Sequence, residues 1–202
     1  MQQTLFKLVD GINILPFDGE ALFYPDFLSP QESQFYFDHI LHSFTWKQEK
    51  ITIYDKEMMQ PRLTAFCGDE YRDLEYSDTI IKPQPWTEKM IVLKQKCEAI
   101  AGVSFTNALF NLYRDGKDSV SWHRDKEKNW GAEPVIASVS LGAARTFQLR
   151  NYKDKKITRS VELTPGSLLI MRGAIQRCWE HQVPKTNKRI GARINITFRI
   201  LV

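Results

Sequence analysis

From about residue 103 onward, the chain is a succession of short runs rich in β-branched and aromatic residues, separated by turn signals. The clearest turns are at Asp115-Gly116, Gly142 and Pro165-Gly166. The runs between them are FTNALFNLY, VIASVSL, RTFQLRN, the two halves of SVELTPGSLLIMRG, and ARINITFRILV. Strands this short and this closely spaced predict an antiparallel sandwich or barrel.

Two helices are predicted before these strands. In LSPQESQFYFDHILHSF, Ser29 is the N-cap, Pro30 suits the first helical position and Glu32 completes a capping box. In TEKMIVLKQKCEAIAG, Thr87 caps the helix and Gly102 ends it. The side chains expected to face the core are Phe35, Phe37, Ile40 and Leu41 in the first helix and Met90, Ile91, Leu93, Cys97 and Ile100 in the second. We therefore expect a mostly β protein with flanking helices.

The length and composition suit one globular domain. The chain has 202 residues, of which 43% are hydrophobic and 26% charged. No run of eighteen apolar residues is present, and the first residues lack the pattern of a secretory signal. The three cysteines are few and scattered, which favours a reducing compartment. We expect a cytoplasmic monomer (nuclear if the source is eukaryotic) with no membrane contact.

Positive charge is concentrated toward the C-terminus. The net charge of the whole chain is +4, but residues 151–202 alone hold eleven Lys and Arg against three acidic residues, a local excess of eight positive charges. Such a surface attracts polyanions, nucleic acids among them. Charge alone is equally consistent with an ordinary solvated basic face.

The stretch SVSWHRDKEKNW contains a His-x-Asp pair, His123 and Asp125. Residues at i and i+2 of a strand point to the same side, so the two side chains can converge. They are two of the three ligands of the 2-His-1-carboxylate triad that binds Fe(II). His39 and His42 lie on the first predicted helix, whereas His181 lies between two predicted strands and is the natural third ligand. An isolated His-x-Asp is also typical of a simple polar pair.

The last predicted strand, RINITFR, alternates polar and apolar residues. Its polar positions are Arg193, Asn195, Thr197 and Arg199, and they share one face. Buried charge is costly unless it is paired, and arginine grips a carboxylate with two parallel hydrogen bonds, so this face suits a dianionic ligand. Asn111 and Tyr113 in NLYRDG share a face in the same way and could hydrogen-bond an acid. The alternative for both strands is a polar face turned to solvent.

In their order along the chain, these motifs resemble the AlkB-type Fe(II)/2-oxoglutarate-dependent nucleic-acid dealkylases. The resemblance runs from Pro61 to the C-terminus and rests on PRLTAFCGD, NLYRDG, WHRD, SVSLGAARTFQLR, PGSLLIM, HQVPK and RINITFR. It implies a double-stranded β-helix (jelly roll) in a single domain, 1–202. Residues 1–60 would form a helical and hairpin extension, and residues 61–202 a substrate lid and the jelly-roll core.

The resemblance also implies roles for individual residues. It makes His123, Asp125 and His181 the ligands of Fe(II), with O2 as the oxidant. It makes Asn111, Tyr113, Arg193, Asn195 and Arg199 contacts of the cosubstrate 2-oxoglutarate, with Thr197 nearby. Arg193 would hold the C5 carboxylate, and Arg199 would lie nearer the C1 end. Because both histidines must be neutral to bind a metal, activity is expected to fall at acid pH.

The implied substrate is a methylated base in DNA or RNA, flipped out or already single-stranded. Tyr76 stands where the family places an aromatic and is the expected stacking residue. Leu74 falls where similar proteins carry a tyrosine, so one expected polar contact is missing. Glu127 is the residue expected to read the exocyclic amine. Tyr54, at the tip of a hairpin predicted in ITIYDKEMMQPR, could wedge into a duplex, although an ordinary surface hairpin fits the pattern as well.

The resemblance predicts oxidative demethylation of bases of the 1-methyladenine and 3-methylcytosine type, with release of formaldehyde. One alternative is an oxygenase with the same cofactors and a protein or small-molecule substrate. The basic C-terminal segment and Tyr76 argue against it. A second alternative is a silent module that binds nucleic acid without turnover. The complete His-Asp-His set and the two arginines argue against that one.

Overall fold

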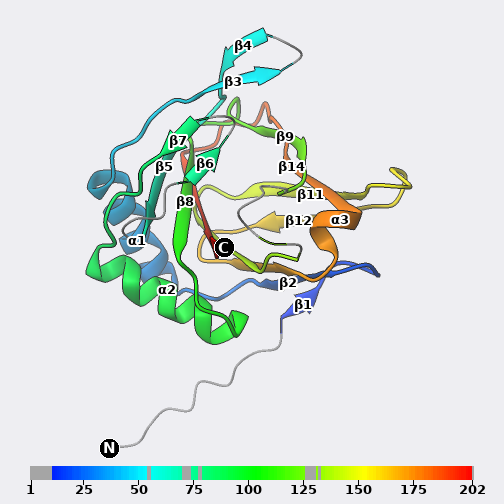
Figure 1. The fold of residues 1–202 in the computed structure, drawn as a ribbon, viewed down its shortest axis with the longest axis horizontal. Helices are drawn as coiled ribbons and strands as arrows, with labels where there is room; N and C mark the ends of the chain where they lie inside the picture. Colours follow the sequence, from blue (N-terminus) through cyan, green and yellow to red (C-terminus); the bar gives the residue numbers. More distant parts are fainter. Residues whose placement is uncertain are drawn as a thin grey trace, which may run out of the picture.

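The computed structural model describes residues 11–53, 56–69, 74–76, 79–125, 131 and 133–201. For residues 51–53, 56, 74–76 and 79–81, only the secondary structure is described. Two antiparallel sheets and two long helices account for most of this part of the chain (Figure 1). This confirms a mostly β architecture with flanking helices.

The larger sheet has seven described strands, and each is antiparallel to its neighbours. In spatial order they are β1 (Ile12–Asn13), β2 (Glu20–Tyr24), β13 (Leu168–Arg172), β10 (Ile136–Gly142), β15 (Arg193–Arg199), β8 (Asn107–Tyr113) and β5 (Leu63–Gly68). The strand β15 is thus central, between β10 and β8, and its face toward the smaller sheet is shielded from solvent.

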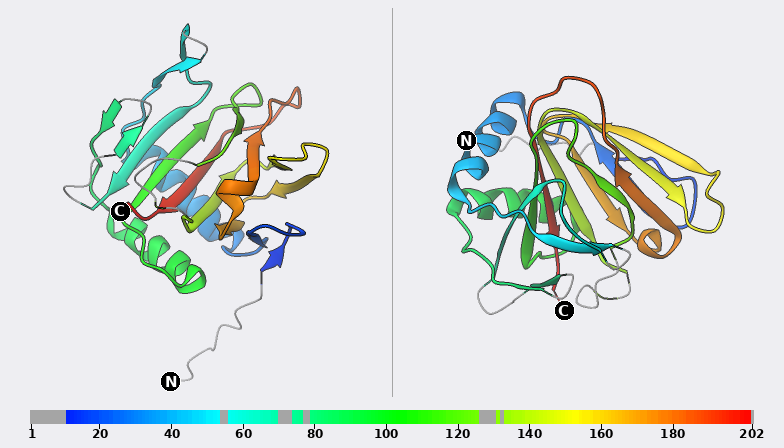
Figure 2. Two further views of the ribbon diagram at one scale, coloured as in Figure 1. Left: turned by 45° about the vertical axis from the view of Figure 1, so that its right-hand side comes forward. Right: turned by 90° about the horizontal axis from the view of Figure 1, so that it is seen from above.

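The smaller sheet lies over the larger one (Figure 2). Its described strands, in spatial order, are β12 (Thr158–Leu163), β11 (Arg145–Asn151), β14 (Trp179–Val183) and β9 (Val120–His123). A single turn of helix, α3 (Ile175–Cys178), leads into β14. Residues of both sheets, among them Leu169, Phe147 and Trp179, form one buried apolar cluster between them. Two antiparallel sheets packed in this way are the expected jelly roll.

Two helices cover the outer face of the larger sheet: α1 (Pro30–Ser43) and α2 (Glu88–Ala101). The predicted caps are present. The Ser29 side chain accepts a hydrogen bond from the Glu32 backbone at 3.2 Å, and the Glu32 carboxylate accepts one from the Ser29 backbone at 2.9 Å. The Thr87 hydroxyl caps α2, and Gly102 ends it at a left-handed φ of 73°.

Two side chains expected in the core are exposed. Phe35 on α1 is 47% exposed and Ile91 on α2 is 38% exposed. On α1 Ile40 is buried, and Phe37 and Leu41 pack against the core as predicted, so only Phe35 of the four side chains was misplaced. The Lys89 ammonium lies 4.9 Å from the centroid of the Phe35 ring, a cation–π contact at the surface.

Two hairpins complete the described structure: β3 (Lys50–Ile53) with β4 (Lys56–Met59), and β6 (Leu74–Tyr76) with β7 (Thr79–Ile81). The first projects from the body of the molecule at the top of Figure 1. The chain before it runs along the free edge of β5, where Lys47 and Thr64 form an antiparallel bridge. No helix among the described residues is both long and apolar enough to span a membrane.

Candidate metal centre and its cavity

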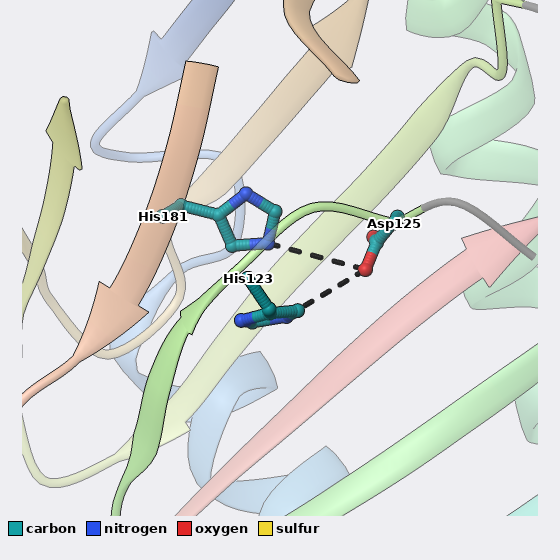
Figure 3. Close-up of side chains that lie close together, drawn as sticks. All are labelled: His123, Asp125 and His181. Carbon is teal, nitrogen blue, oxygen red and sulfur yellow. Dashed lines mark ion pairs between the residues drawn. The ribbon is translucent and has the colours of Figure 1, made fainter. Parts of the chain in front are cut away.

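His123, Asp125 and His181 converge between the two sheets, and their side chains point toward one another (Figure 3). His123 ends β9 and is directly opposite His181 of β14, while Asp125 follows just beyond β9. The Asp125 Oδ1 atom lies 3.6 Å from His123 Nε2 and 4.0 Å from His181 Nε2. One ligand atom from each of the three lies within 4.8 Å of the others, an arrangement that can hold a metal ion.

The Asp125 carboxylate is buried and held in its charged form. Its Oδ2 atom accepts a hydrogen bond from Arg199 Nη2 at 2.9 Å, and its backbone N–H donates to Gln176 Oε1 at 2.9 Å. Burial alone would raise the pKa of Asp125, but the positive charge of Arg199 and the two imidazoles outweigh it, so the pKa lies far below its usual range. The carboxylate is therefore available as an anionic ligand at any physiological pH.

Both histidines present Nε2 toward the carboxylate. Burial, together with the nearby His123 and Arg199, lowers the pKa of His181 to about 3, so its imidazole is neutral at physiological pH. The Nδ1 atom of His123 lies 2.8 Å from the Ser121 carbonyl oxygen. A carbonyl can only accept, so Nδ1 carries a proton and Nε2 is the atom that can bind a metal. The donor atoms are thus two imidazole nitrogens and one carboxylate oxygen, a set that suits a metal ion.

The polar face of β15 is turned inward. Arg193, Asn195, Thr197 and Arg199 are between 1% and 8% exposed, while Ile194, Ile196 and Phe198 pack into the core under the helices. The alternation predicted from RINITFR is therefore confirmed, and the alternative of a solvated face is wrong. Asn111 and Tyr113 of the neighbouring β8 are also buried on this side.

Arg193 has hydrogen-bonding capacity to spare. Its Nη2 atom donates to Ser140 Oγ at 2.8 Å, but Nε and Nη1 have no partner among the described residues. The guanidinium carbon lies 5.1 Å from the centre of the Tyr113 ring. Burial lowers the pKa of Arg193 to about 10, which still leaves it charged at neutral pH. A buried cation with open donors indicates a site for an anion.

The other polar groups of this face are already bonded. Asn195 Nδ2 donates to Ser138 Oγ at 2.8 Å and to the Val139 carbonyl at 3.1 Å. The Thr197 hydroxyl donates to the Leu109 carbonyl at 3.1 Å and accepts from Arg199 at 2.7 Å. These bonds fix the inner face in one arrangement, which suits a site that binds without rearranging.

The three residues of the His–Asp–His cluster and the inward polar side chains of β15 and β8 line one cavity of about 550 Å³ between the sheets. Its wall also includes residues that the sequence motifs did not single out, such as Gln60, Arg62 and Ser138. Arg62 donates through Nε to Asn111 Oδ1 at 2.8 Å and so orients that amide. The alternation of Ser138 and Ser140 in VIASVSL was a readable signal. Gln60, Arg62 and Gln176 carried none, because they reach the site from separate segments.

The expected substrate contacts lie outside what the structure describes in side-chain detail. Leu74 and Tyr76 fall in β6, for which the side chains are not described. Glu127 and Tyr54 lie outside the described residues altogether. Their roles stay predictions.

Sequence comparison places the chain in a known family. A model of the 2OG-Fe(II) oxygenase superfamily matches residues 20–199. Alpha-ketoglutarate-dependent dioxygenase alkB homolog 3 from rat is 38% identical over 185 residues, which cover 87% of this chain and 62% of that protein. The human alkB homolog 3 is also 38% identical, with 64% of its length covered. The DNA oxidative demethylase ALKBH2 of Arabidopsis thaliana is 34% identical, with 91% and 67% covered.

The chain therefore spans less than two thirds of the length of the alkB homolog 3 proteins that it matches. The fold is similar to the solved structure of OsALKBH1, with a TM-score of 0.66 at 16% identity over 89% of this chain and 97% of that one. The family match spans all described strands of both sheets except β1, and every residue of the His–Asp–His cluster. The chain belongs to the 2OG-Fe(II) oxygenase superfamily and, within it, to the AlkB-type proteins.

Proposed function

We propose that the protein is an Fe(II)- and 2-oxoglutarate-dependent dioxygenase that oxidatively demethylates N-alkylated bases of the 1-methyladenine and 3-methylcytosine type in DNA or RNA. The observation that carries this proposal is the single cavity in which a His–Asp–His cluster lies beside a buried arginine with open donors. The relatives named as alkB homolog 3 and ALKBH2 support the substrate class.

In this proposal, His123, Asp125 and His181 are the ligands of Fe(II). The donor set fits, since it offers the neutral His181 imidazole, the His123 imidazole with Nε2 toward the cluster, and one carboxylate with a low pKa. Arg199 and Gln176 hold the carboxylate in place through their hydrogen bonds to Asp125. Outer partners of this kind orient the ligands of a metal and tune its affinity.

The cosubstrate site is the inner face of β15 and β8. Arg193 meets the C5 carboxylate of 2-oxoglutarate with its open Nε and Nη1 atoms, and Tyr113 closes over the guanidinium. Arg199 lies nearer the C1 end, beside Asp125. Asn111, Asn195 and Thr197 are neutral hydrogen-bonding neighbours along the same face.

When bound, Fe(II) and 2-oxoglutarate supply the oxidation of a methyl group by O2, with loss of CO2 from the cosubstrate and formation of succinate. The hydroxylated N-methyl group then leaves as formaldehyde and the base is restored. The part of the protein is to position the methyl group and exclude water. Tyr76 stacks on the flipped base, Leu74 packs beside it and Glu127 reads its exocyclic amine.

The partner in this proposal is alkylated DNA or RNA, bound by a monomer in the cytoplasm or nucleus. The exposed lysines and arginine of the C-terminal segment would follow the phosphate backbone. They are Lys153, Lys155, Lys156, Lys185, Lys188 and Arg189.

The proposal is tested by incubating the protein with Fe(II), 2-oxoglutarate, ascorbate and oligonucleotides that each carry one methylated base. Products are read by mass. We expect loss of one methyl group from 1-methyladenine and 3-methylcytosine, with formaldehyde released in equal amount. His181→Ala abolishes this turnover, whereas His42→Ala, on the surface of α1, leaves it unchanged. Turnover of 2-oxoglutarate without any change in the oligonucleotides would favour a protein or small-molecule substrate.

A further inference from the structure

Buried polar atoms that lack a partner show where a site is completed by something other than the protein. Native proteins pair the great majority of such atoms, so each exception calls for an explanation. Among the described residues, Arg193 is one exception, and the cosubstrate proposed above accounts for it. Gln60 is another, since neither Nε2 nor Oε1 of its side chain has a hydrogen-bond partner.

Gln60 is 1% exposed and lines the same cavity as the metal cluster. It follows β4 directly, so it stands where the β3–β4 hairpin joins the body of the molecule. Met58, at 48% exposure, also lines the cavity. Gln60 therefore lies at the base of the hairpin, whereas the two arginines proposed to hold the cosubstrate, Arg193 and Arg199, are on β15.

The backbone around Gln60 is firmly held. Its N–H donates to the Glu49 carbonyl at 2.9 Å, and its carbonyl accepts from Gln48 Nε2 at 2.8 Å. The next carbonyl, of Pro61, accepts from the Ser119 N–H at 3.0 Å. The backbone of Gln60 is thus held by hydrogen bonds, whereas its side-chain amide has none among the described residues.

A buried amide without partners is destabilising compared with an apolar side chain of the same shape. A glutamine at position 60 therefore adds nothing to the stability of the fold. The amide is neutral and offers one acceptor and two donors, so it does not suit the dianionic cosubstrate as the arginines do. It suits the edge of a base that presents a donor and an acceptor side by side.

We propose that Gln60 recognises the edge of a methylated purine in the cavity, accepting a hydrogen bond from N6 and donating one to N7. This inference rests on the proposed function. A glutamine amide pairs with adenine through those two atoms, whereas cytosine offers only its N4 amine on the corresponding edge. A methyl group on N1 leaves N7 free, and the amine keeps a hydrogen on the N7 side. Gln60 therefore favours 1-methyladenine over 3-methylcytosine.

The test compares the protein with its Gln60→Met variant, in which an unbranched apolar side chain of similar length replaces the amide. The two substrates are oligonucleotides that differ only in carrying 1-methyladenine or 3-methylcytosine. We expect kcat/KM on 1-methyladenine to fall roughly fivefold or more relative to that on 3-methylcytosine, as loss of a two-bond base contact implies. The half-saturation for 2-oxoglutarate stays the same. Gln34→Met, at the exposed surface of α1, leaves the ratio unchanged.

Two measurements that need no turnover distinguish this inference from the proposed function on which it rests. Without O2 and with Mn(II) and 2-oxoglutarate present, fluorescence anisotropy gives the affinity for each oligonucleotide. The variant should lose affinity for the 1-methyladenine strand by a similar factor, and its melting temperature should be equal or higher because no native bond is removed. A lower melting temperature with an unchanged ratio of affinities would make Gln60 a structural residue and overturn the inference. A wild-type protein that binds selectively but releases no formaldehyde would overturn only the proposed function.

Discussion

Arg193 and Arg199 stand on the same face of β15, yet their guanidinium groups have different surroundings. Arg199 donates to Asp125 and to Thr197 within the protein. Arg193 donates to Ser140 and keeps two nitrogen atoms without a partner in the described structure. We therefore expect Arg193 to contribute to cosubstrate affinity and Arg199 to the integrity of the metal cluster.

Replacing Arg193 by Ala should raise the half-saturation for 2-oxoglutarate at least tenfold. Removing one partner of a buried charged pair typically costs about 2–5 kcal/mol. Nucleic-acid binding should change little, because the side chain is 1% exposed. The measurement is a titration of 2-oxoglutarate in the turnover assay, with Arg159→Ala on the exposed surface of β12 as the control. An unchanged half-saturation for 2-oxoglutarate would show that β15 does not bind the cosubstrate.

Replacing Gln176 by Leu should weaken metal binding by about 10–100-fold, the usual effect of losing an outer partner of a metal ligand. The Gln176 side chain is the acceptor for the Asp125 N–H, so its loss frees the segment that carries the carboxylate. Mn(II) binding followed by electron paramagnetic resonance measures the change without turnover. Gln182→Leu, on β14 and bonded to Gln148, should keep the wild-type affinity. Equal Mn(II) affinity in all three proteins would rule out a positioning role for Gln176.

At the scale of elements, the turn between β8 and β9 sets the position of His123. Asp118 in this turn is 4% exposed and accepts three hydrogen bonds from Arg114, two from its guanidinium and one from its backbone. The Arg145 side chain donates to the carbonyls of Asp115, Asp118 and Pro184, which ties the turn to the segment after β14. The turn therefore links the strands that carry the two histidines.

The Asp118 turn should make stability depend on acid pH. Burial raises the pKa of Asp118, but the hydrogen bonds and charge of Arg114 outweigh it, so the folded pKa lies below the ordinary value of 3.8. A carboxyl whose folded pKa is lowered contributes stability above that value and loses it as the pH falls through the folded pKa. Asp118→Asn should therefore cost about 1–3 kcal/mol at neutral pH, and the gap from wild type should narrow below about pH 4.

Urea denaturation at a series of pH values checks this expectation. Asp26→Asn, an exposed residue before α1, should leave the stability near that of wild type throughout. A gap between wild type and Asp118→Asn that stayed constant down to about pH 2.5 would show that the carboxylate charge is not what holds the turn.

The elements that local pattern alone determines were predictable. The caps at Ser29 and Thr87, the strand alternation in RINITFR and the turns at Gly142 and Gly166 depend on neighbours in sequence, and the structure confirms them. The facing of Phe35 and Ile91 was wrong because each lies in a run of consecutive apolar residues, Phe35–Phe37 and Met90–Leu93, that is wider than one stripe and does not show which side meets the sheet. The short strand β2 gave too little alternation to be noticed.

Part of the candidate site was predictable for the same reason. His123 and Asp125 are close in sequence, and the four polar residues of β15 share one strand, so periodicity brings each group together. Gln60 and Arg62 are far from both groups in sequence and reach the cavity only through the pairing of distant strands. Gln176 does not line the cavity and contacts Asp125 from the short helix α3. Burial and missing hydrogen bonds identify such residues, and neither can be read from a linear pattern.

At the scale of the whole molecule, the positive charges of the C-terminal segment divide into two populations. Arg193 and Arg199 lie in the interior, whereas Lys153, Lys155 and Lys156 are exposed on the β11–β12 turn. On the same sheet Arg150 lies 4.2 Å from the Trp122 ring centre. The three exposed lysines of the β11–β12 turn are therefore among the groups available to a polyanion.

Oligonucleotide binding should weaken with added salt if these lysines meet phosphates. Three or four contacts give a log–log slope of about −2 to −3. Changing Lys155 and Lys156 together to Glu should flatten that slope and weaken binding to all sequences alike, without altering the half-saturation for 2-oxoglutarate. Anisotropy at increasing salt measures the slope, with Lys89→Glu on α2 as the control. A flat salt dependence in the wild type would favour an uncharged substrate over nucleic acid.

The pairing of β2 with β13 also bears on how the protein is made in a cell. Glu20 and Arg172, which form an ion pair across these two strands, are 152 residues apart in sequence. At a synthesis rate of about 5–20 residues per second, the ribosome needs roughly 8 to 30 seconds to reach β13 after β2 has been made. During that time β2 has an unsatisfied strand edge and apolar side chains with nothing to cover them, which is the condition under which nascent chains aggregate. The yield of soluble protein should therefore depend on chaperone supply and growth temperature more than the stability of the finished fold would suggest.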